Sequence, residues 1–163
     1  MAYIRIKDVP RNKKKYTYAY LVKTSWRKRK HPKQQSLRYL GKIYTFPPEH
    51  KLPHCLNHNL PIEEIYKDLL RVELLRHGFQ EKKSGLFTKE HCFVDIPRIL
   101  FYNTEGKEIV LQLHSGFLCS YSFHTLLSTP LTTTKHFAKT LALSGFHLEP
   151  ETFVELYEKL TNA

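Results

Sequence analysis

Alternating side chains in the stretch from Lys13 to Tyr44 constrain the fold of this chain more than any other feature. Between Tyr16 and Trp26, tyrosine, valine, threonine and tryptophan alternate with small, aliphatic or polar residues. Side chains on one face of a strand repeat every two residues, and aromatic and β-branched residues favour strands over helices. The stretch from Ser36 to Tyr44 alternates in the same way. The pattern therefore predicts two strands joined by a basic turn.

A third strand is predicted upstream of this pair, from Tyr3 to Val9, where side chains alternate again. The residues that follow it, 10–12, are typical of a turn. Three strands joined by short turns form an antiparallel sheet. Gly41, in the last strand, indicates a bulge or a close approach of another backbone segment. Apolar residues occur on both faces, so the pattern leaves open which face is buried.

The middle of the chain contains a predicted linker followed by a predicted helix. Residues 46–60 contain three prolines and no periodicity, which indicates a linker. A helix is predicted next, with Asn59 as its N-cap, Pro61 in its first turn and Gly78 at its end. Its apolar residues recur at helical spacing.

Short apolar segments predict a β region after this helix. Two of them are Cys92–Ile96 and Ile99–Tyr102. The turn residues Asn103–Gly106 lead into Glu108–Leu113, so residues 99–113 are expected to form a β-hairpin.

The C-terminal part is predicted to be helical. A short helix is expected at Ser120–Leu127, and Thr133 or Thr134 caps a second helix that ends at Ser144-Gly145. Pro150 begins a last helix, which is expected to pair with the one before it. The predicted fold class is α+β, with an N-terminal three-stranded antiparallel sheet, a helix, a β-hairpin region and a C-terminal helical pair. The expected division is a basic three-stranded β-sheet at 1–46, a Pro/His-rich linker at 47–59 and an α+β domain at 60–163.

Positive charge is concentrated at the N-terminus. The chain has a formal net charge of +11, from 26 Lys and Arg against 15 Asp and Glu. Residues 1–45 carry 14 of the 26 cations and one acid, Asp8, whereas the remainder is slightly acidic. Such segregation favours a polyanionic partner, nucleic acid first of all, over a basic surface that serves only solubility.

The basic and aromatic residues of this segment are the candidate nucleic-acid-binding residues. Lysine and arginine neutralise phosphates, and aromatic rings can stack on unpaired bases. A sheet face could alternatively enter the major groove of a duplex. For most of the tyrosine row (Tyr16, Tyr18 and Tyr20), packing against the second half of the chain is expected rather than stacking on bases. The candidate residues are Lys13, Lys14, Lys15, Trp26, Arg27, Lys28, Arg29, Lys30, Lys33, Arg38 and Lys42.

The same segment resembles the start of a family of DNA-handling enzymes. Residues 18–22 (YAYLV), the basic stretch, Gln34-Gln35 and residues 37–41 (LRYLG) are similar to the N-terminal segment of some insertion-sequence transposases of the DDE class. They are also similar to the opening of small uncharacterised archaeal proteins. The resemblance covers about residues 1–45 and implies a hairpin that contacts DNA, so DNA is favoured slightly over RNA. It does not imply strand transfer, because the chain has three Asp residues and no room after residue 46 for a ribonuclease-H-like domain.

A zinc site is the sharpest alternative that the residues suggest. Zinc accepts four nitrogen or sulfur ligands, and four histidines or cysteines fall within nine residues of the linker. Pro53 opposes the regular helix that would bring them together, so neither a metal nor another cofactor is expected. The side chains concerned are His50, His54, Cys55 and His58, with His91-Cys92 as a further pair.

No enzymatic activity is expected. Cys119 could be imagined as a nucleophile with His114 or His124 as its base, but a cysteine in apolar surroundings is usually a small buried hydrophobe. The competing class is a protein–protein adaptor, whose C-terminal domain docks a partner while the basic hairpin holds RNA or the ribosome.

The remaining expectations concern the protein's surroundings. No apolar run approaches the roughly 20 residues that span a bilayer, and the N-terminus lacks the apolar core of a signal peptide. Three cysteines without framework spacing fit a reducing compartment. We therefore expect a cytoplasmic protein that does not bind membranes, and association with the nucleoid or the ribosome stays open. The pattern leaves the oligomeric state open.

Overall fold

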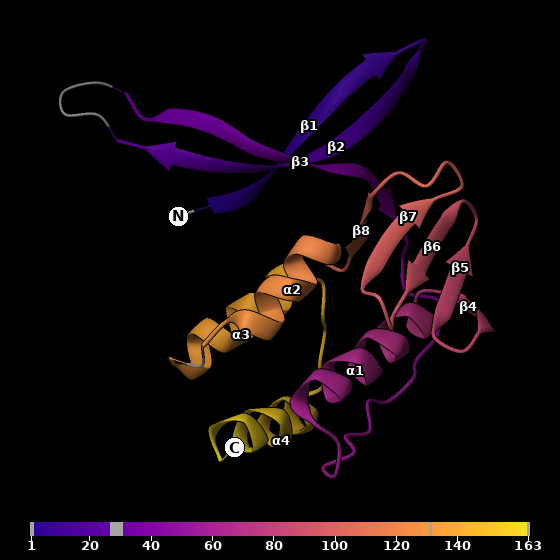
Figure 1. The fold of residues 1–163 in the computed structure, drawn as a ribbon, viewed down its shortest axis with the longest axis vertical. Coiled ribbons are helices and arrows are strands. Elements are labelled where there is room, and N and C mark those ends of the chain that lie inside the picture. The colour runs from indigo at the N-terminus through magenta and orange to yellow at the C-terminus, as the bar shows by residue number, and fades with distance from the viewer. Residues whose placement is uncertain (1, 27–30, 131, 163) are drawn as a thin grey trace.

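The computed structural model describes residues 2–26, 31–130 and 132–162. It has an α+β fold, with an N-terminal run of three strands, a helix, further strands and C-terminal helices (Figure 1). The predicted fold class is confirmed in this outline. The elements are β1 (Ala2–Arg11), β2 (Lys14–Ser25), β3 (Lys33–Thr45), α1 (Ile62–Arg76), β4 (Gln80–Lys83), β5 (Leu86–Lys89), β6 (Cys92–Asp95), β7 (Leu100–Asn103), β8 (Ile109–Leu113), β9 (Gly116–Leu118), α2 (Ser120–Ser128), α3 (Thr134–Leu143) and α4 (Pro150–Thr161).

The three N-terminal strands belong to a sheet of five. Its order is β1-β2-β3-β8-β9, and every neighbouring pair is antiparallel except β3 and β8, which are parallel. The first part of β3 pairs with β2, and its last residues, 42–45, pair with β8. This sheet therefore continues across the boundary expected near residue 46. In Figure 1 the β1–β3 part of the sheet extends beyond the rest of the molecule, and we call this part the ribbon.

Gly41 marks the point at which the ribbon meets the rest of the chain. The register between β2 and β3 shifts here, because Ala19 lies opposite Gly41 while the next residue, Tyr20, lies opposite Tyr39. Gly41 has a φ of +136°, and a Cβ at this position would lie 2.4 Å from the carbonyl oxygen of Glu108. The bulge and the close backbone approach predicted for this glycine are both confirmed.

The buried face of the ribbon carries its small and aliphatic residues. These residues form a cluster with Val110 and Cys119 of the rest of the chain, which we call the body; the ribbon contributes Ala19, Leu21, Leu40 and Ile43. The tyrosines of β2 alternate with these residues and therefore lie on the opposite face. They are half-buried and belong to neither core cluster, so the expectation that most of the row packs as core is wrong.

Helix α1 contributes to the main core, which it shares with both sheets and the C-terminal helices. It ends where predicted, because Gly78 has a φ of +80° and the Phe79 N–H donates to the Leu74 carbonyl at 3.0 Å. Its N-cap is Pro61, not the predicted Asn59. The Asn59 N–H instead donates to the Asn57 side chain in the turn before the helix.

The β region differs most from prediction. Strands β4 to β7 form a separate antiparallel meander, of which β4 and β5 were not predicted. Of the hairpin expected over residues 99–113, only the turn forms, where the Asn103 N–H donates to the Lys107 carbonyl at 3.0 Å and Tyr102 forms an antiparallel bridge with Glu108. The two strands then separate, because β7 belongs to the meander and β8 to the five-stranded sheet.

The C-terminal part contains α2, α3 and α4, so the predicted helical pair describes it only in part. Thr133 caps α3 by accepting a hydrogen bond from the His136 N–H at 3.1 Å. Phe137 of α3 stacks on Phe153 of α4, with 5.5 Å between ring centroids. No helix in the described parts of the chain is both long and apolar enough to cross a membrane.

Candidate nucleic-acid interface

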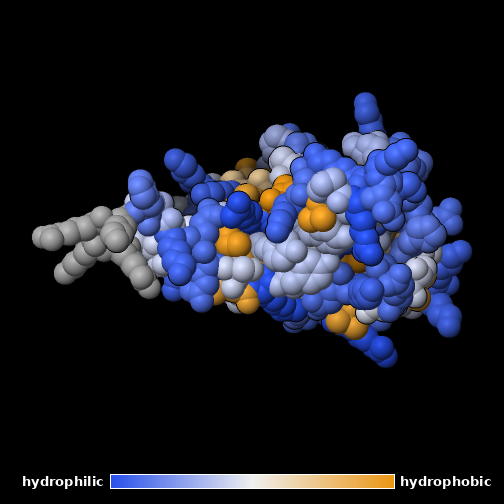
Figure 2. All heavy atoms as spheres, turned by 90° about the horizontal axis from the view of Figure 1, so that it is seen from above, coloured by the Kyte–Doolittle hydropathy of each residue, from blue (hydrophilic) through white to orange (hydrophobic). Residues whose placement is uncertain are grey.

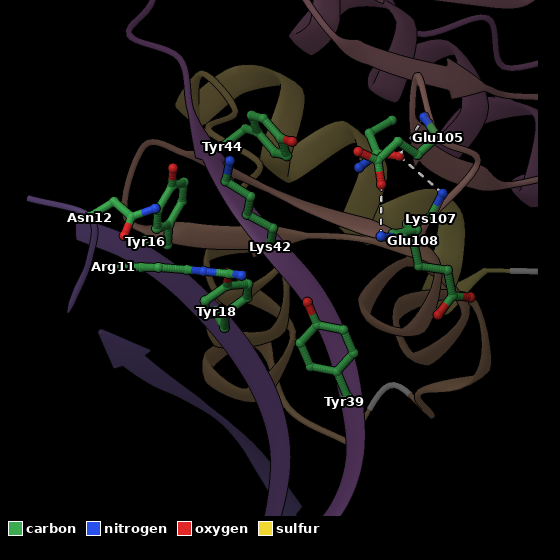
Figure 3. Close-up of a pocket in the computed structure, with 11 residues that line it drawn as sticks. Arg11, Asn12, Tyr16, Tyr18, Tyr39, Lys42, Tyr44, Glu105, Lys107 and Glu108 are labelled. Carbon is green, nitrogen blue, oxygen red and sulfur yellow. Dashed lines mark hydrogen bonds and ion pairs between the residues drawn. The ribbon is translucent and has the colours of Figure 1, made fainter. Parts of the chain in front are cut away.

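A cleft of about 840 Å³ opens where the outer face of the ribbon meets the loop between β7 and β8. Figure 3 shows residues of β2 and β3 on one side of this cleft and residues of the loop on the other. We call it the tyrosine cleft. It is lined by Arg11, Asn12, Tyr16, Tyr18, Tyr39, Lys42, Tyr44, Asn103, Glu105, Lys107 and Glu108.

Four tyrosine rings line the cleft, and strand pairing explains why they gather. Tyr16 and Tyr18 are two residues apart on β2, so they share a face. Tyr39 of β3 lies opposite Tyr20, and its ring centroid is 5.3 Å from the Tyr20 centroid and 6.1 Å from that of Tyr18. Burial raises the pKa of Tyr39, with the neighbouring tyrosines adding to the effect, so its hydroxyl stays protonated and can donate a hydrogen bond. The rings thus form an aromatic surface that remains partly accessible.

Cations accompany these rings. The Nζ of Lys42 lies 4.7 Å from the ring centroid of Tyr16 and 4.9 Å from that of Tyr44, at cation–π distance. Arg11 and Lys107 also line the cleft. Both acids of the lining form ion pairs. Glu105 lies 2.7 Å from Lys107, and Glu108 lies 3.0 Å from Arg38, which is outside the cleft.

A lysine-rich turn adjoins the cleft at the tip of the β1–β2 hairpin. Asn12 and Lys13 both have positive φ, 49° and 62°, as in the two-residue turns that fit the twist of a hairpin. Lys13, Lys14 and Lys15 are all exposed, and we call these three residues the lysine turn. Lys15 lies 2.8 Å from Asp8, and its ammonium, with a hydrogen bond from Thr17, lowers the pKa of that carboxyl. The other two lysines point their charge at solvent.

The predicted binding residues do not form one patch. Trp26, which is 78% exposed, and Lys33 lie at the opposite end of β2 from the lysine turn. At about 3.4 Å per residue, β2 separates its two ends by about 37 Å. Arg27, Lys28, Arg29 and Lys30, also predicted to bind, lie outside the described residues.

Arg38, also predicted to bind, lies on the opposite face of the ribbon from the tyrosine cleft. It lies opposite Leu21, on the face of the ribbon that packs against the body, and its Nη2 is 3.0 Å from Glu108 Oε2. The bulge at Gly41 puts Arg38 and Lys42 on opposite faces, although a simple alternation from residue 38 to residue 42 would put them on the same face.

Several residues of the cleft were not in the predicted binding set, although Tyr16 belongs to the tyrosines that were considered for base stacking. Arg11 could have been found by pairing the first two strands around their turn. Lys107 could not, since it comes from a loop more than 60 residues away along the chain. The same outer face also carries Arg5 and Lys7, which line a shallower depression of about 290 Å³ beside Tyr20.

The surface around the ribbon is mainly hydrophilic. Figure 2, seen from the top of Figure 1, shows isolated hydrophobic residues among hydrophilic ones. Such a face suits a charged or polar partner better than an apolar one.

The linker residues weighed as an alternative zinc site do not come together. His50, Cys55 and His58 are exposed, and His54 alone turns inward, where its Nδ1 lies 2.8 Å from Glu149 Oε2. Cys119 is buried among the ribbon's core residues, and this burial raises the pKa of its thiol. The fold therefore places His54 beside a carboxylate and Cys119 in apolar surroundings.

Comparisons of the chain with protein-family models, with curated proteins and with solved structures found no match. What the tyrosine cleft does must therefore be inferred from its own geometry and charge.

Proposed function

We propose that this protein binds nucleic acid through the tyrosine cleft and the lysine turn, without catalysing a reaction on it. The observation that carries the proposal is an open cleft in which four tyrosine rings lie beside Arg11, Lys42 and Lys107. Aromatic faces with interleaved cations are the arrangement by which proteins hold single strands, because every base has a face that can stack.

Unpaired strands fit this cleft better than duplexes. A duplex offers only the edges of its bases, whereas tyrosine rings bind the flat faces of bases that have left the stack. Phosphates on either side of a stacked base would meet Lys42 and the lysine turn. The proposal covers DNA and RNA, with DNA first because the segment resembles one that contacts DNA.

The dependence of binding on salt tests this proposal directly. A single strand held by about five cations should show log K falling against log[salt] with a slope of about −3.5, since each neutralised phosphate contributes about −0.7. Fluorescence anisotropy with labelled oligo(dT), oligo(U) and a random duplex measures this slope between about 50 and 200 mM salt. The single strands are expected to bind more tightly than the duplex. Binding that is absent at low salt, or independent of salt, would rule the proposal out.

The lysine turn should contribute charge without contributing stability. Lys13→Gln combined with Lys14→Gln should make the salt slope shallower by about 1.4, because two phosphate contacts are lost. The melting temperature should stay unchanged, since both side chains are exposed. The matched control is Lys82→Gln with Lys83→Gln, two adjacent exposed lysines of β4 on the other sheet. An equal change of slope in both pairs would mean that only net charge matters.

A further inference from the structure

Three side chains able to ligate a metal converge at the C-terminal end of α1. Glu73 lies in the last turn of α1 and His77 is its C-cap, so the two share one side of the helix. His114 comes from the two-residue turn between β8 and β9, where it holds a positive φ of 51°. The first two side chains are almost fully buried, whereas 25% of the His114 side chain is exposed.

Their ligand atoms form a nearly equilateral triangle. His114 Nε2 is 3.3 Å from His77 Nε2 and 3.2 Å from Glu73 Oε2, and His77 Nε2 is 3.7 Å from Glu73 Oε2. Atoms bound to a tetrahedral zinc ion at about 2.0–2.1 Å are about 3.3–3.4 Å apart. The triangle therefore has the size of one face of a zinc coordination tetrahedron.

A hydrogen bond on its far side orients the His77 ring. Its Nδ1 lies 2.7 Å from the carbonyl oxygen of Phe46, which can only accept, so Nδ1 carries the hydrogen. In the neutral ring Nε2 is then a bare acceptor, and it faces the other two ligand atoms. A backbone carbonyl in this role is the usual support of a metal-bound histidine.

Hydrogen bonds within the triangle cannot satisfy all three atoms. His77 Nε2 and Glu73 Oε2 are both acceptors, and His114 can offer only the one hydrogen of its Nε2. That hydrogen lies between two acceptors at 3.3 and 3.2 Å and can be aligned with only one of them. A cation at the centre would meet all three lone pairs, which removes the cost of an unmet buried acceptor.

The other oxygen of Glu73 is held by a separate set of groups. Oε1 accepts a hydrogen bond from the His147 N–H at 3.2 Å and lies 3.4 Å from Arg76 Nη1. His54 Nε2 is 3.3 Å from the same oxygen, although it makes no hydrogen bond among the described residues. These contacts turn Oε2 towards the two imidazoles and fix it there. The carboxylate is thus positioned before any ion arrives.

We propose that Glu73, His77 and His114 bind a divalent transition-metal ion, with zinc preferred. Two imidazole nitrogens and one carboxylate oxygen suit zinc, whereas magnesium and calcium take oxygen ligands. The ion joins the end of α1 to the β8–β9 turn. The His147 ring lies beside this site, 5.1 Å from the His114 ring between centroids.

Metal titration of the full chain tests this site. The tag-free protein is stripped with a chelator and titrated with Zn²⁺ by calorimetry, and separately with Co²⁺ by visible absorption. We expect one ion per chain, a higher melting temperature with zinc, and cobalt bands of tetrahedral intensity. Stripped protein that binds no zinc, or that gives only octahedral cobalt bands, would show that the three side chains form a hydrogen-bonded core cluster instead.

Variants distinguish this site from surface histidines. His114→Ala should weaken zinc binding by about 100-fold or more, because one of three ligands is lost while two buried ones remain. His50→Ala combined with His58→Ala should retain the wild-type affinity, since both side chains are exposed and lie outside the triangle. If the linker pair abolishes binding and His114→Ala does not, the assignment is overturned. The cobalt spectrum of the wild-type chain decides the matter should His114→Ala fail to fold.

Discussion

Replacing Gly41 with alanine is expected to lower the free energy of unfolding by about 3–5 kcal/mol. Two costs combine in this residue. Its φ of +136° is one that side chains rarely adopt, and the added Cβ would lie 2.4 Å from Glu108 O and 2.9 Å from the Cα of Ile109. Both neighbours are backbone atoms of the segment that pairs with β3, so neither can rotate away. Urea or thermal unfolding, followed by circular dichroism, measures the loss.

Gly106 provides the matched control for this substitution. It also has a positive φ, +73°, but a Cβ there would meet nothing within 4 Å. Gly106→Ala should therefore cost about 1 kcal/mol, the conformational part alone. Similar losses in the two variants would mean that the approach of Glu108 does not determine the stability of the junction. A larger loss at Gly41 would identify this crossing as the point that fixes the ribbon on the body.

Removing two rings from the tyrosine cleft is expected to have the largest effect on binding. Each base stacked on an aromatic side chain contributes about 1–3 kcal/mol, so Tyr18→Ala with Tyr39→Ala should weaken single-strand binding by about 100-fold or more. The fold should survive, because Tyr18 is only half-buried, Tyr39 is exposed, and their cross-strand contact contributes about 0.2–1 kcal/mol. Anisotropy titration at fixed salt gives the affinity, and circular dichroism verifies the fold.

Phenylalanine at the same two positions separates the rings from their hydroxyls. Tyr18→Phe with Tyr39→Phe keeps both aromatic faces, so its affinity should stay within a few-fold of the wild type. If phenylalanine weakens binding as strongly as alanine, hydrogen bonds from the hydroxyls are what hold the strand. Unchanged binding in the alanine pair would exclude the cleft and direct attention to the other end of the ribbon, at Trp26 and Lys33.

Local sequence patterns predicted the helices and strands that are determined by residues close to one another in the chain. Alternation located β1, β2 and β3, and Gly78, Thr133 and Pro150 mark the ends of helices that the structure contains. Strand β4 was missed because its sequence, QEKK, is polar and exposed throughout, so it carries no apolar alternation. Strand β9 was also missed, because its three residues are too few to show an alternating pattern. The parallel pairing of β3 with β8 joins segments far apart in the sequence, and no local signal indicates it.

The two sites show the same limit. Counting histidines along the chain favoured His50, His54 and His58, which are close in sequence but point to different surroundings. Glu73 and His77 are four residues apart on a predicted helix, so the sequence indicates that they share one side of it. The sequence does not indicate their third partner, His114, because only the turn between β8 and β9 brings it to them.

The position of β1 at the edge of the five-stranded sheet gives its charges a second role. A ten-residue edge strand offers backbone groups on which a second chain could add, and proteins commonly block such edges with charge or proline. Arg5, Lys7 and Pro10 supply both. Two ribbons that approach edge to edge would bring like charges together, so the charge that we propose attracts nucleic acid would also oppose polymerisation of the protein. A nucleic acid that neutralised this strand would remove that protection.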